Sequence, residues 1–335
     1  MLIKKAPDVP SSEITDERYY LRRREFIRLA GTAAIGAAAA GTIGACGTSG
    51  VDASSTSTPV STSTSPAAAG QAPLNVSKRT IATDEKLNAF DEITSYNNYY
   101  EFGTNKGDPK RYAGRLTTSP WTVKIDGHCS KPADYHLEDL IKPFEIEERI
   151  YRHRCVEAWS MVIPWAGIPL ASVLKRAEPT GKATFVEFTT VLRPTQMPGL
   201  PYGGLNWPYT EGLRMDEAMH PLAFLAVGLY GKTLLNQNGA PIRLVVPWKY
   251  GFKGAKSIVR IRFVDKMPRT SWVEQNPDWY GFYSNVNPNV SPVRWDQSRE
   301  RRLPSFFATR KTEMFNGYGD QVASLYAGMD LRRFY

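Results

Sequence analysis

Residues 148–165 read ERIYRHRCVEAWSMVIPW, a stretch in which branched and aromatic residues recur as they do in strands. We predict a strand over residues 148–156. Similar patterns predict four more strands, WTVKIDG (121–127), TFVEFTTVL (184–192), PIRLVVP (241–247) and SIVRIRFV (257–264). Helical patterns are sparser: apolar residues at helical spacing follow Pro169 over residues 170–177, and LEDLIKPF (137–144) is a second candidate. This mixture predicts the α+β class with a mostly mixed sheet.

The composition is that of a folded globular protein. The chain has 335 residues, of which 42% are hydrophobic and 22% charged, which excludes the disordered and collagen-like classes. Residues 76–335 contain no low-complexity gap and no internal repeat, so we predict one domain there. The formal charge is +9, and the 35 basic and 28 acidic groups beyond residue 45 retain +7 of it. The basic excess therefore belongs to the folded part.

The N-terminus has the pattern of an export signal. RRREFIR (22–28) precedes LAGTAAIGAAAAGTIGA (29–45), an uncharged run that is too weakly hydrophobic for a typical membrane anchor. The pair of Arg23 and Arg24 resembles the twin-arginine motif, which exports proteins that have already folded; the alternative is an ordinary secretory signal. We predict a twin-arginine signal peptide over residues 1–45 and a location in the periplasm or on the outer face of the cell membrane.

A candidate lipid-attachment site and a tether follow the signal. The sequence IGAC (43–46) resembles a lipobox, so Cys46 is a candidate lipid anchor; the alternative is cleavage nearby, with Cys46 discarded or left as a free thiol. Residues 46–75 are rich in Ser, Thr, Ala and Gly and predict a flexible tether. Cys129 and Cys155 are the only other cysteines, so the disulfide potential is small, although one bridge between them is formally possible.

Common catalytic signatures are absent from the sequence, which has no GxSxG, HExxH, GxxxxGK[ST] or CxxC pattern. Cys155 is the remaining candidate. Its basic neighbours Arg152, His153 and Arg154 are expected to lower its thiol pKa and favour the thiolate, which attacks as a nucleophile or binds a soft metal. A buried structural cysteine and a nucleophile formed by Cys155 with His153 are the alternatives.

A second concentration of cations lies in PIRLVVPWKYGFKGAKSIVRIR (241–262). Lys and Arg that flank Gly251 and Gly254 predict a phosphate-binding segment. The alternative is a strand edge kept basic to prevent edge pairing. Nucleic acid is disfavoured as a partner because an exported protein rarely meets it.

Four segments resemble one known family. YNNYYEFG (96–103), RCVEAWSMVIPW (154–165), GLRMDEAMHP (212–221) and NGAPIRLVVPWKYGFKGAKSIV (238–259) are similar to the catalytic subunits of bacterial periplasmic protein-methionine-sulfoxide reductases. Those subunits belong to the sulfite-oxidase-fold molybdoenzymes. The resemblance spans residues from about Asn97 to Tyr335 and implies a single molybdopterin-binding domain of the sulfite-oxidase type.

The resemblance implies a molybdenum–molybdopterin cofactor whose metal is bound by the Cys155 thiolate, and soft sulfur ligation suits that metal. It also implies which residues hold the pterin and its phosphate. These are Asn97, Tyr100, Glu101, Thr190, Asn238, Arg243, Gly254, Ala255 and Lys256.

Two departures bear on the substrate. Sulfite oxidases typically follow their molybdenum cysteine with a sequence like AGNRR, whereas VEAW (156–159) follows here. The Glu157 carboxylate is expected to repel sulfite and tolerate a neutral sulfoxide, and to help deliver protons to the departing oxygen. The chain is also shorter than the family between Gly199 and Gly203, which affects the substrate range if that loop borders the entrance. Cys129 is interpreted as a structural thiol.

The implied function is the reduction of methionine sulfoxide residues in exported proteins. The resemblance implies electrons from the quinone pool, supplied by a haem-bearing membrane subunit with which the chain, as a monomer, forms a heterodimer. The tether would raise the effective concentration of the chain at that partner. The alternatives are a sulfite or small S-/N-oxide oxidoreductase on the same scaffold, and a non-catalytic tethered lipoprotein that binds a ligand or partner through its basic surface.

Overall fold

The computed structural model describes residues 71–335 except residues 82, 84, 293 and 306. The predicted signal peptide and the candidate lipobox lie outside the described residues. The start of the folded part differs from the prediction, because residues 71–75, which composition assigns to the tether, are hydrogen-bonded. The Ala72 amide donates to Thr233 Oγ1 at 3.0 Å and the Leu74 amide to the Gly231 carbonyl at 2.8 Å. The described residues all belong to one compact unit.

The first sheet is built around β5 (Trp159–Pro169), its longest strand. On one side β5 pairs antiparallel with β4, and on the other it pairs in parallel with β12 at its start and antiparallel with β8 at its end. Within the described residues the sheet has eight strands. The other seven are β1 (Val76–Ile81), β4 (Ile146–Arg154), β8 (Phe224–Leu229), β9 (Lys232–Thr233), β10 (Arg243–Val245), β12 (Arg299–Arg302) and β13 (Thr309–Lys311).

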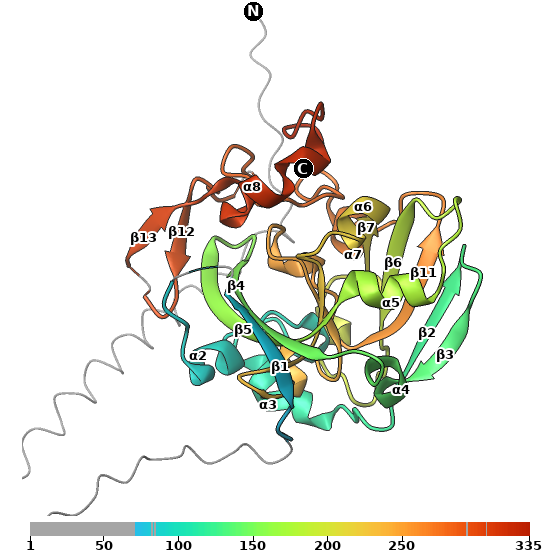
Figure 1. The fold of residues 1–335 in the computed structure, drawn as a ribbon. Coiled ribbons are helices and arrows are strands. Elements are labelled where there is room, and N and C mark those ends of the chain that lie inside the picture. Colours follow the sequence, from blue (N-terminus) through green and yellow to red (C-terminus); the bar gives the residue numbers. More distant parts are fainter. Residues whose placement is uncertain (1–70, 82, 84, 293, 306) are drawn as a thin grey trace, which may run out of the picture. The chain divides into compact units, whose positions relative to one another are not determined.

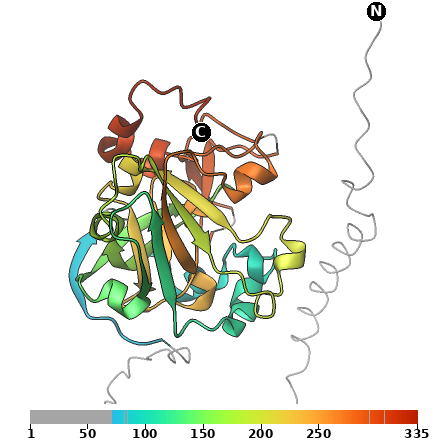
Figure 2. The same cartoon turned by 90° about the vertical axis from the view of Figure 1, so that its right-hand side faces the viewer.

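The second sheet has five strands in the order β3-β2-β11-β6-β7 over the described part of the chain. Its β2 and β11 are parallel and its other pairs antiparallel. In Figure 1, β4 and β5 lie to the left and β2, β3, β6 and β11 to the right, and Figure 2 shows the second sheet from its own side. The bounds are β2 (Thr122–Gly127), β3 (Ala133–His136), β6 (Phe185–Thr190), β7 (Thr210–Arg214) and β11 (Ile258–Val264).

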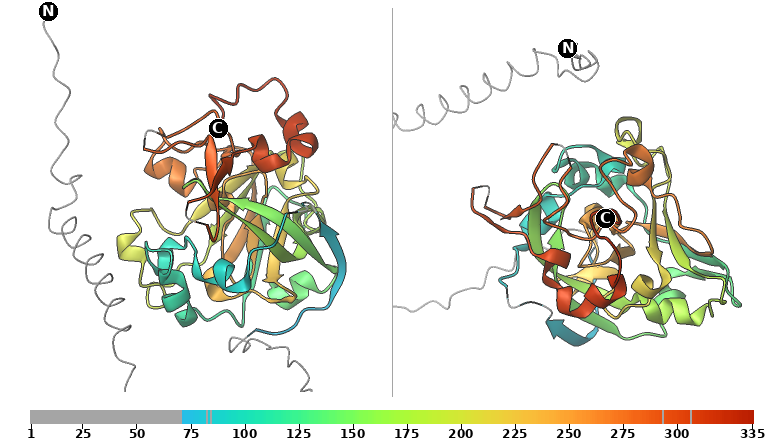
Figure 3. Two further views of the ribbon diagram at one scale, coloured as in Figure 1. Left: turned by 90° about the vertical axis from the view of Figure 1, so that its left-hand side faces the viewer. Right: turned by 90° about the horizontal axis from the view of Figure 1, so that it is seen from above.

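The helices are short and lie around the sheets, with α2 and α3 next to each other in Figures 1 and 3. The α-helices are α2 (Phe90–Ser95), α3 (Asp108–Tyr112), α4 (Leu137–Ile141), α5 (Leu170–Arg176), α6 (Met215–Ala218), α7 (Ser271–Gln275) and α8 (Gly319–Val322). The 3₁₀ segments are η2 (Tyr100–Phe102), η3 (Ala113–Arg115), η4 (Leu200–Tyr202), η5 (Asn236–Asn238), η6 (Gly251–Lys253), η7 (Met314–Gly317) and η8 (Ala323–Tyr326). In the part of the chain that the structure describes, no helix has the length and apolarity needed to cross a membrane.

Burial explains which elements were predictable. In β2, Val123 and Ile125 are buried between exposed neighbours, so the alternation predicted from the sequence is confirmed. The predicted helix is α5, which begins directly after Pro169 and buries Leu170, Val173 and Leu174. The strand β5 was not predicted, because all its residues before Pro169 are buried and the sequence shows no alternation. The mixed pairing of both sheets confirms the α+β class.

The alternative interpretation of the cationic segment as a solvated basic edge has little support. Its last part forms β11, which lies between β2 and β6, and its β10 pairs only with β8 among the described strands but is buried along its length. Two of its lysines are buried in ion pairs: Lys249 Nζ lies 2.6 Å from Glu217 and Lys253 Nζ lies 2.6 Å from Glu211. These charges stabilise the interior rather than protect an edge.

Candidate active site

Cys155 lies in the tight turn that joins β4 to β5. Its amide donates to the Trp159 carbonyl at 2.9 Å, and the Ala158 amide donates to the Cys155 carbonyl at 3.1 Å. Ala158 takes a left-handed conformation with φ of 63°, which closes the turn. The turn holds the Cys155 side chain, which is 6% exposed, in the wall of a cavity of about 320 Å³. That volume is at the lower end of the range for ligand sites, about 300–1,000 Å³.

One face of the β4–β5 hairpin forms a wall of this cavity. Successive side chains of a strand point to opposite faces, so residues two apart share a face. Apart from Val156 in the turn, the lining residues of the hairpin follow this spacing. They are His153, Cys155, Glu157, Trp159, Met161, Ile163 and Trp165.

The surroundings of the Cys155 sulfur correct one expectation. The sulfur lies 3.5 Å from Asn98 Nδ2 and 3.5 Å from the Glu157 amide nitrogen. Burial, together with the nearby Glu157 carboxylate, raises the pKa of the thiol to about 12. The Arg154 charge lowers this pKa, as predicted, but burial outweighs it, so the predicted net lowering is wrong. Among the described residues, His153 makes no hydrogen bond to Cys155, which leaves the Cys–His nucleophile without support.

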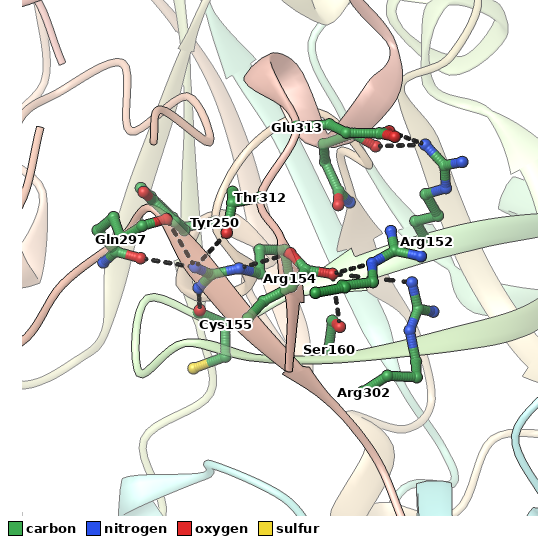
Figure 4. A network of polar contacts seen from close by, with 12 residues as sticks. Arg152, Arg154, Cys155, Ser160, Tyr250, Gln297, Arg302, Thr312 and Glu313 are labelled. Atoms are coloured by element: carbon green, nitrogen blue, oxygen red, sulfur yellow. Dashed lines mark hydrogen bonds and ion pairs between the residues drawn. The ribbon is translucent and has the colours of Figure 1, made fainter. Parts of the chain in front are cut away.

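The Arg154 side chain is committed to a buried network that holds the backbone of Cys155 (Figure 4). Its Nε donates to Glu300 at 2.9 Å and its Nη2 to Gln297 Oε1 at 2.8 Å and Thr312 Oγ1 at 3.2 Å. Its Nη1 donates to the Cys155 carbonyl oxygen. Figure 4 shows the sulfur of Cys155 directed away from the guanidinium. Arg154 therefore acts on the position of the turn.

Glu157 is held as a carboxylate in the same wall. Lys106 Nζ lies 3.0 Å from its Oε1, and Trp159 Nε1 and Asn98 Nδ2 donate to its Oε2 at 2.9 Å and 3.1 Å. Burial opposes ionisation, but the hydrogen bonds from Lys106 and Trp159 outweigh it and keep the pKa of Glu157 below its usual value. Because Lys106 balances its charge, Glu157 repels an anion less than a lone carboxylate would.

Two asparagines point acceptor oxygens into the cavity from opposite parts of the sequence. Asn97 Nδ2 and Asn238 Nδ2 both donate to the carbonyl of Ile93 in α2, at 2.8 Å and 3.0 Å. That shared acceptor fixes the orientation of both amides. Their Oδ1 atoms are buried and have no hydrogen-bond partner among the residues that the structure describes. Buried polar atoms are normally paired, so this pair is suited to a ligand with N–H donors.

Two cations line the same cavity as the buried Glu101 carboxyl, whose charge favours the charged form of Lys256. Over the described residues, neither Arg243 nor Lys256 forms an ion pair, and Arg243 donates instead to the carbonyls of Asn238 and Gly254. Burial lowers the pKa of Arg243, and burial with the Arg243 charge lowers that of Lys256. Gly239 permits their approach, because its φ is +98° and a Cβ there would lie 2.9 Å from the Lys256 side chain. Two cations beside one buried carboxyl leave a positive excess, which favours an anionic group.

Seven of the residues implied by the family resemblance line the cavity, together with Glu157. The seven are Asn97, Tyr100, Glu101, Cys155, Asn238, Arg243 and Lys256. Thr190, Gly254 and Ala255 are buried outside this lining. The Oγ1 of Thr190 has no partner within the described residues, whereas the Gly254 and Ala255 amides donate within their own turn.

Sequence reasoning missed Asn98, Lys106 and Trp165. Trp165 lines the cavity, and its buried Nε1 has no partner in the described part of the chain. Its spacing of ten residues from Cys155 is an even number, which is the signal that could have found it. Asn98 directly follows Asn97, but nothing in the sequence connects Lys106 with Glu157.

The loop between Gly199 and Gly203 borders this site. The Gly199 amide donates to the Glu101 carbonyl at 2.8 Å, and a Cβ at Gly199 would lie 2.2 Å from the Tyr100 carbonyl oxygen. Leu205, just beyond the loop, lines the cavity. We therefore expect the shorter loop between Gly199 and Gly203 to affect the substrate range, because it lies next to the cavity.

The donor set suits a molybdopterin with a metal at Cys155. Residues 71–335, with the gaps given above, contain no cluster of three or more His, Cys, Asp or Glu side chains that could hold a metal ion. A metal bound by the Cys155 sulfur therefore takes its other ligands from a cofactor. Asn97 Oδ1 and Asn238 Oδ1 would accept from pterin N–H groups, and Arg243 and Lys256 would bind its phosphate. The residues present fit this cofactor.

Comparisons with known proteins agree with this geometry. The family model described as the oxidoreductase molybdopterin binding domain matches residues 111–272, which include Cys155, Asn238, Arg243 and Lys256. The fold and the cavity thus define a molybdopterin-binding oxidoreductase.

Curated relatives match over their whole length. The protein-methionine-sulfoxide reductase catalytic subunits MsrP of Xanthomonas axonopodis pv. citri and Burkholderia mallei are 53% and 51% identical to the chain, and each match covers 100% of both proteins. The chain belongs to the MsrP family of protein-methionine-sulfoxide reductase catalytic subunits, which confirms the resemblance. Among solved structures, the sulfane dehydrogenase SoxCD from Paracoccus pantotrophus is 19% identical, with a TM-score of 0.39 over 49% of this chain and 42% of that one.

Proposed function

We propose that the protein reduces methionine sulfoxide residues of exported proteins to methionine at a molybdenum–molybdopterin centre in the cavity beside Cys155. The observation that carries this proposal is the pair of unpartnered oxygens on Asn97 and Asn238, held by one carbonyl and facing a cavity that contains Cys155. The names of the full-length relatives supply the substrate. Metal-bound molybdopterin supplies two-electron oxygen-atom transfer when it is bound.

The chain's own residues bind and orient. Asn97 and Asn238 would accept from the pterin, Arg243 and Lys256 would bind its phosphate, and Cys155 would bind molybdenum as the thiolate. Burial disfavours the thiolate form of Cys155. The positive charge of the bound metal would be needed to stabilise it. Arg154 holds the turn in place during this binding.

Many of the side chains that line the cavity are aromatic. Tyr100, Phe252, Trp272, Tyr280 and Trp295 line the cavity, and they provide an apolar surface for the methionine side chain and exclude water. Glu157 and Lys106 place a carboxylate and an ammonium group together near the Cys155 sulfur. We expect this pair to hold and transfer the protons that the reduction consumes.

The proposal extends to location and electron supply. Export by the twin-arginine route, and a lipid anchor at Cys46 where the lipobox is used, would place the chain in the periplasm or on the outer face of the cell membrane. A haem-bearing membrane subunit would then deliver electrons from the quinone pool within a heterodimer. The relatives support this in general terms, because they are named catalytic subunits.

The test compares the purified exported protein with a Cys155→Ser variant. We expect near-stoichiometric molybdenum and pterin in the wild type, reduction of a methionine-sulfoxide peptide with a reduced viologen dye, and loss of both molybdenum and turnover in the variant. Oxidation of sulfite without reduction of the methionine-sulfoxide peptide would contradict the assignment of methionine sulfoxide as the substrate. Absence of metal and pterin after molybdenum-replete growth would contradict an enzymatic function and would favour a tethered binding protein.

A further inference from the structure

A second cavity of about 80 Å³ adjoins the first. The two cavities share three wall residues, Val156, Phe252 and Tyr280, and Val156 directly follows Cys155. A water molecule needs roughly 10–15 Å³ on such a scale, so the second cavity has room for a group of several atoms. None of the residues proposed to hold the cofactor lines the second cavity.

Asn285, which lines the second cavity, has a buried donor without a partner in the described part of the chain. Asn285 is 2% exposed, and its Oδ1 accepts from Lys249 Nζ at 3.0 Å. A lysine ammonium only donates, so the oxygen must face Lys249 and the Nδ2 must point elsewhere. That Nδ2 is buried and has no acceptor within the described residues. An amide donor left in this state is suited to a carbonyl oxygen from a ligand.

The remaining walls combine aromatic and polar side chains. The aromatic ones include Tyr250 and Trp279, in addition to the shared Phe252 and Tyr280. The polar ones are Asp278, Ser284, Asn287, Ser291 and Gln297. Aromatic surface with mostly neutral polar groups suits a peptide group and its side chain, whereas a phosphate would need a cation, and the described lining contains no lysine or arginine.

We propose that the second cavity is a subsite for the peptide residue next to the methionine sulfoxide, with Asn285 Nδ2 donating to a peptide carbonyl. The inference rests on the proposed function. A peptide extends by at most about 3.3–3.6 Å per residue. The peptide residue next to a methionine sulfoxide bound beside Cys155 would therefore reach the second cavity, whose wall includes the adjacent Val156. The subsite would favour peptide-bound methionine sulfoxide over small sulfoxides.

The experiment compares two substrates on the metal-loaded enzyme, dimethyl sulfoxide and the peptide acetyl-alanyl-(methionine sulfoxide)-alanyl-amide. Val290→Trp fills the second cavity without touching the Lys249 contacts. Asn285→Asp keeps the acceptor for Lys249 and removes the donor. Asn289→Trp is the matched control, because Asn289 is the exposed neighbour of Val290 and lies outside the cavity lining.

We expect Val290→Trp to raise KM for the peptide about tenfold, in line with the loss of a packed contact at a binding site. Asn285→Asp should raise it about three- to tenfold, as expected for one hydrogen bond. Both variants should keep kcat and KM for dimethyl sulfoxide within about twofold. Calorimetric affinity for the product peptide, which contains methionine, should fall by the same factors.

Equal peptide KM in Val290→Trp and Asn289→Trp would overturn the subsite, as would an equal loss on both substrates. In that case the Asn285 amide is satisfied by water alone. If the metal-loaded wild type reduces neither substrate, the proposed function itself is overturned, and the two failures are thereby distinguished.

Discussion

Replacing Glu300 by glutamine removes the counter-ion of Arg154 while keeping its shape. The two side chains are 1% and 0% exposed, and Glu300 also accepts from Ser160 Oγ at 2.8 Å and Arg310 Nε at 2.9 Å. Glutamine leaves the buried guanidinium of Arg154 without a compensating charge. Breaking a buried pair from one side costs about 3–5 kcal/mol, and we expect about 3 kcal/mol because the glutamine oxygen still accepts one hydrogen bond.

Thermal unfolding checks this magnitude. About 3 kcal/mol corresponds to a fall in Tm of roughly 6–12 °C for a domain of this size, at about 2–4 °C per kcal/mol. Glu313→Gln is the matched control, because Glu313 is half exposed and pairs with Arg152 at 2.6 Å. It should cost about 0–1 kcal/mol. A Tm for Glu300→Gln within about 2 °C of this control would refute the reasoning.

The same variant tests whether the network positions the metal-binding turn. Arg154 donates to the Cys155 carbonyl, so loss of its counter-ion should loosen the turn and lower the molybdenum content per folded chain. Lys249→Met breaks another fully buried pair, with Glu217, and should lower Tm without lowering the metal content. Equal metal content in both variants would show that the Arg154 network is merely structural.

Three further predictions concern the cavity and its surroundings. Glu157→Gln should lower turnover at least tenfold, as for the loss of a proton-transfer group, while molybdenum stays bound; unchanged turnover at every pH would remove Glu157 from the mechanism. Asn97→Leu removes the unpartnered oxygen and should lose most of the pterin by fluorescence assay; a pterin content equal to that of the wild type would exclude Asn97 as a cofactor ligand. Glu85 is hydrogen-bonded to Arg310, and although burial opposes ionisation, Arg310 and Arg302 keep its pKa below 4.5. A carboxyl whose folded pKa is depressed stabilises the fold above its unfolded pKa, so Glu85→Gln should destabilise at pH 7 and by progressively less as the pH falls below about 4.5; a constant difference down to pH 2 would contradict this.

Local patterns predicted the elements whose two faces differ. Alternation identified β2, and Pro169 with helical spacing identified α5, because one side of each element meets the core and the other meets solvent. The central strand β5 is buried along both faces, so its sequence carries no periodic signal. Its pairing with β12 joins residues that are more than 130 positions apart, and no local pattern contains that information.

The candidate site was predictable mainly through the family resemblance. Seven of the residues it implied line one cavity, but the direction of the Cys155 pKa shift was not foreseen, because its largest cause is burial, which the charges of the neighbouring residues do not reveal. The part played by Asn285 was equally invisible. An asparagine in a loop is ordinary in sequence, and only its contact with Lys249 reveals an amide without an acceptor.

The alternate placement of wall residues along β5 has a consequence for how this hairpin can vary. Insertion or deletion of a single residue between Trp159 and Trp165 would exchange the inward and outward sets, so that Met161 and Ile163 would leave the wall together. The same shift would break the pairing with β4, which is continuous from Ser160 to Gly167. The hairpin therefore accepts an exchange of side chains far more readily than a change of length.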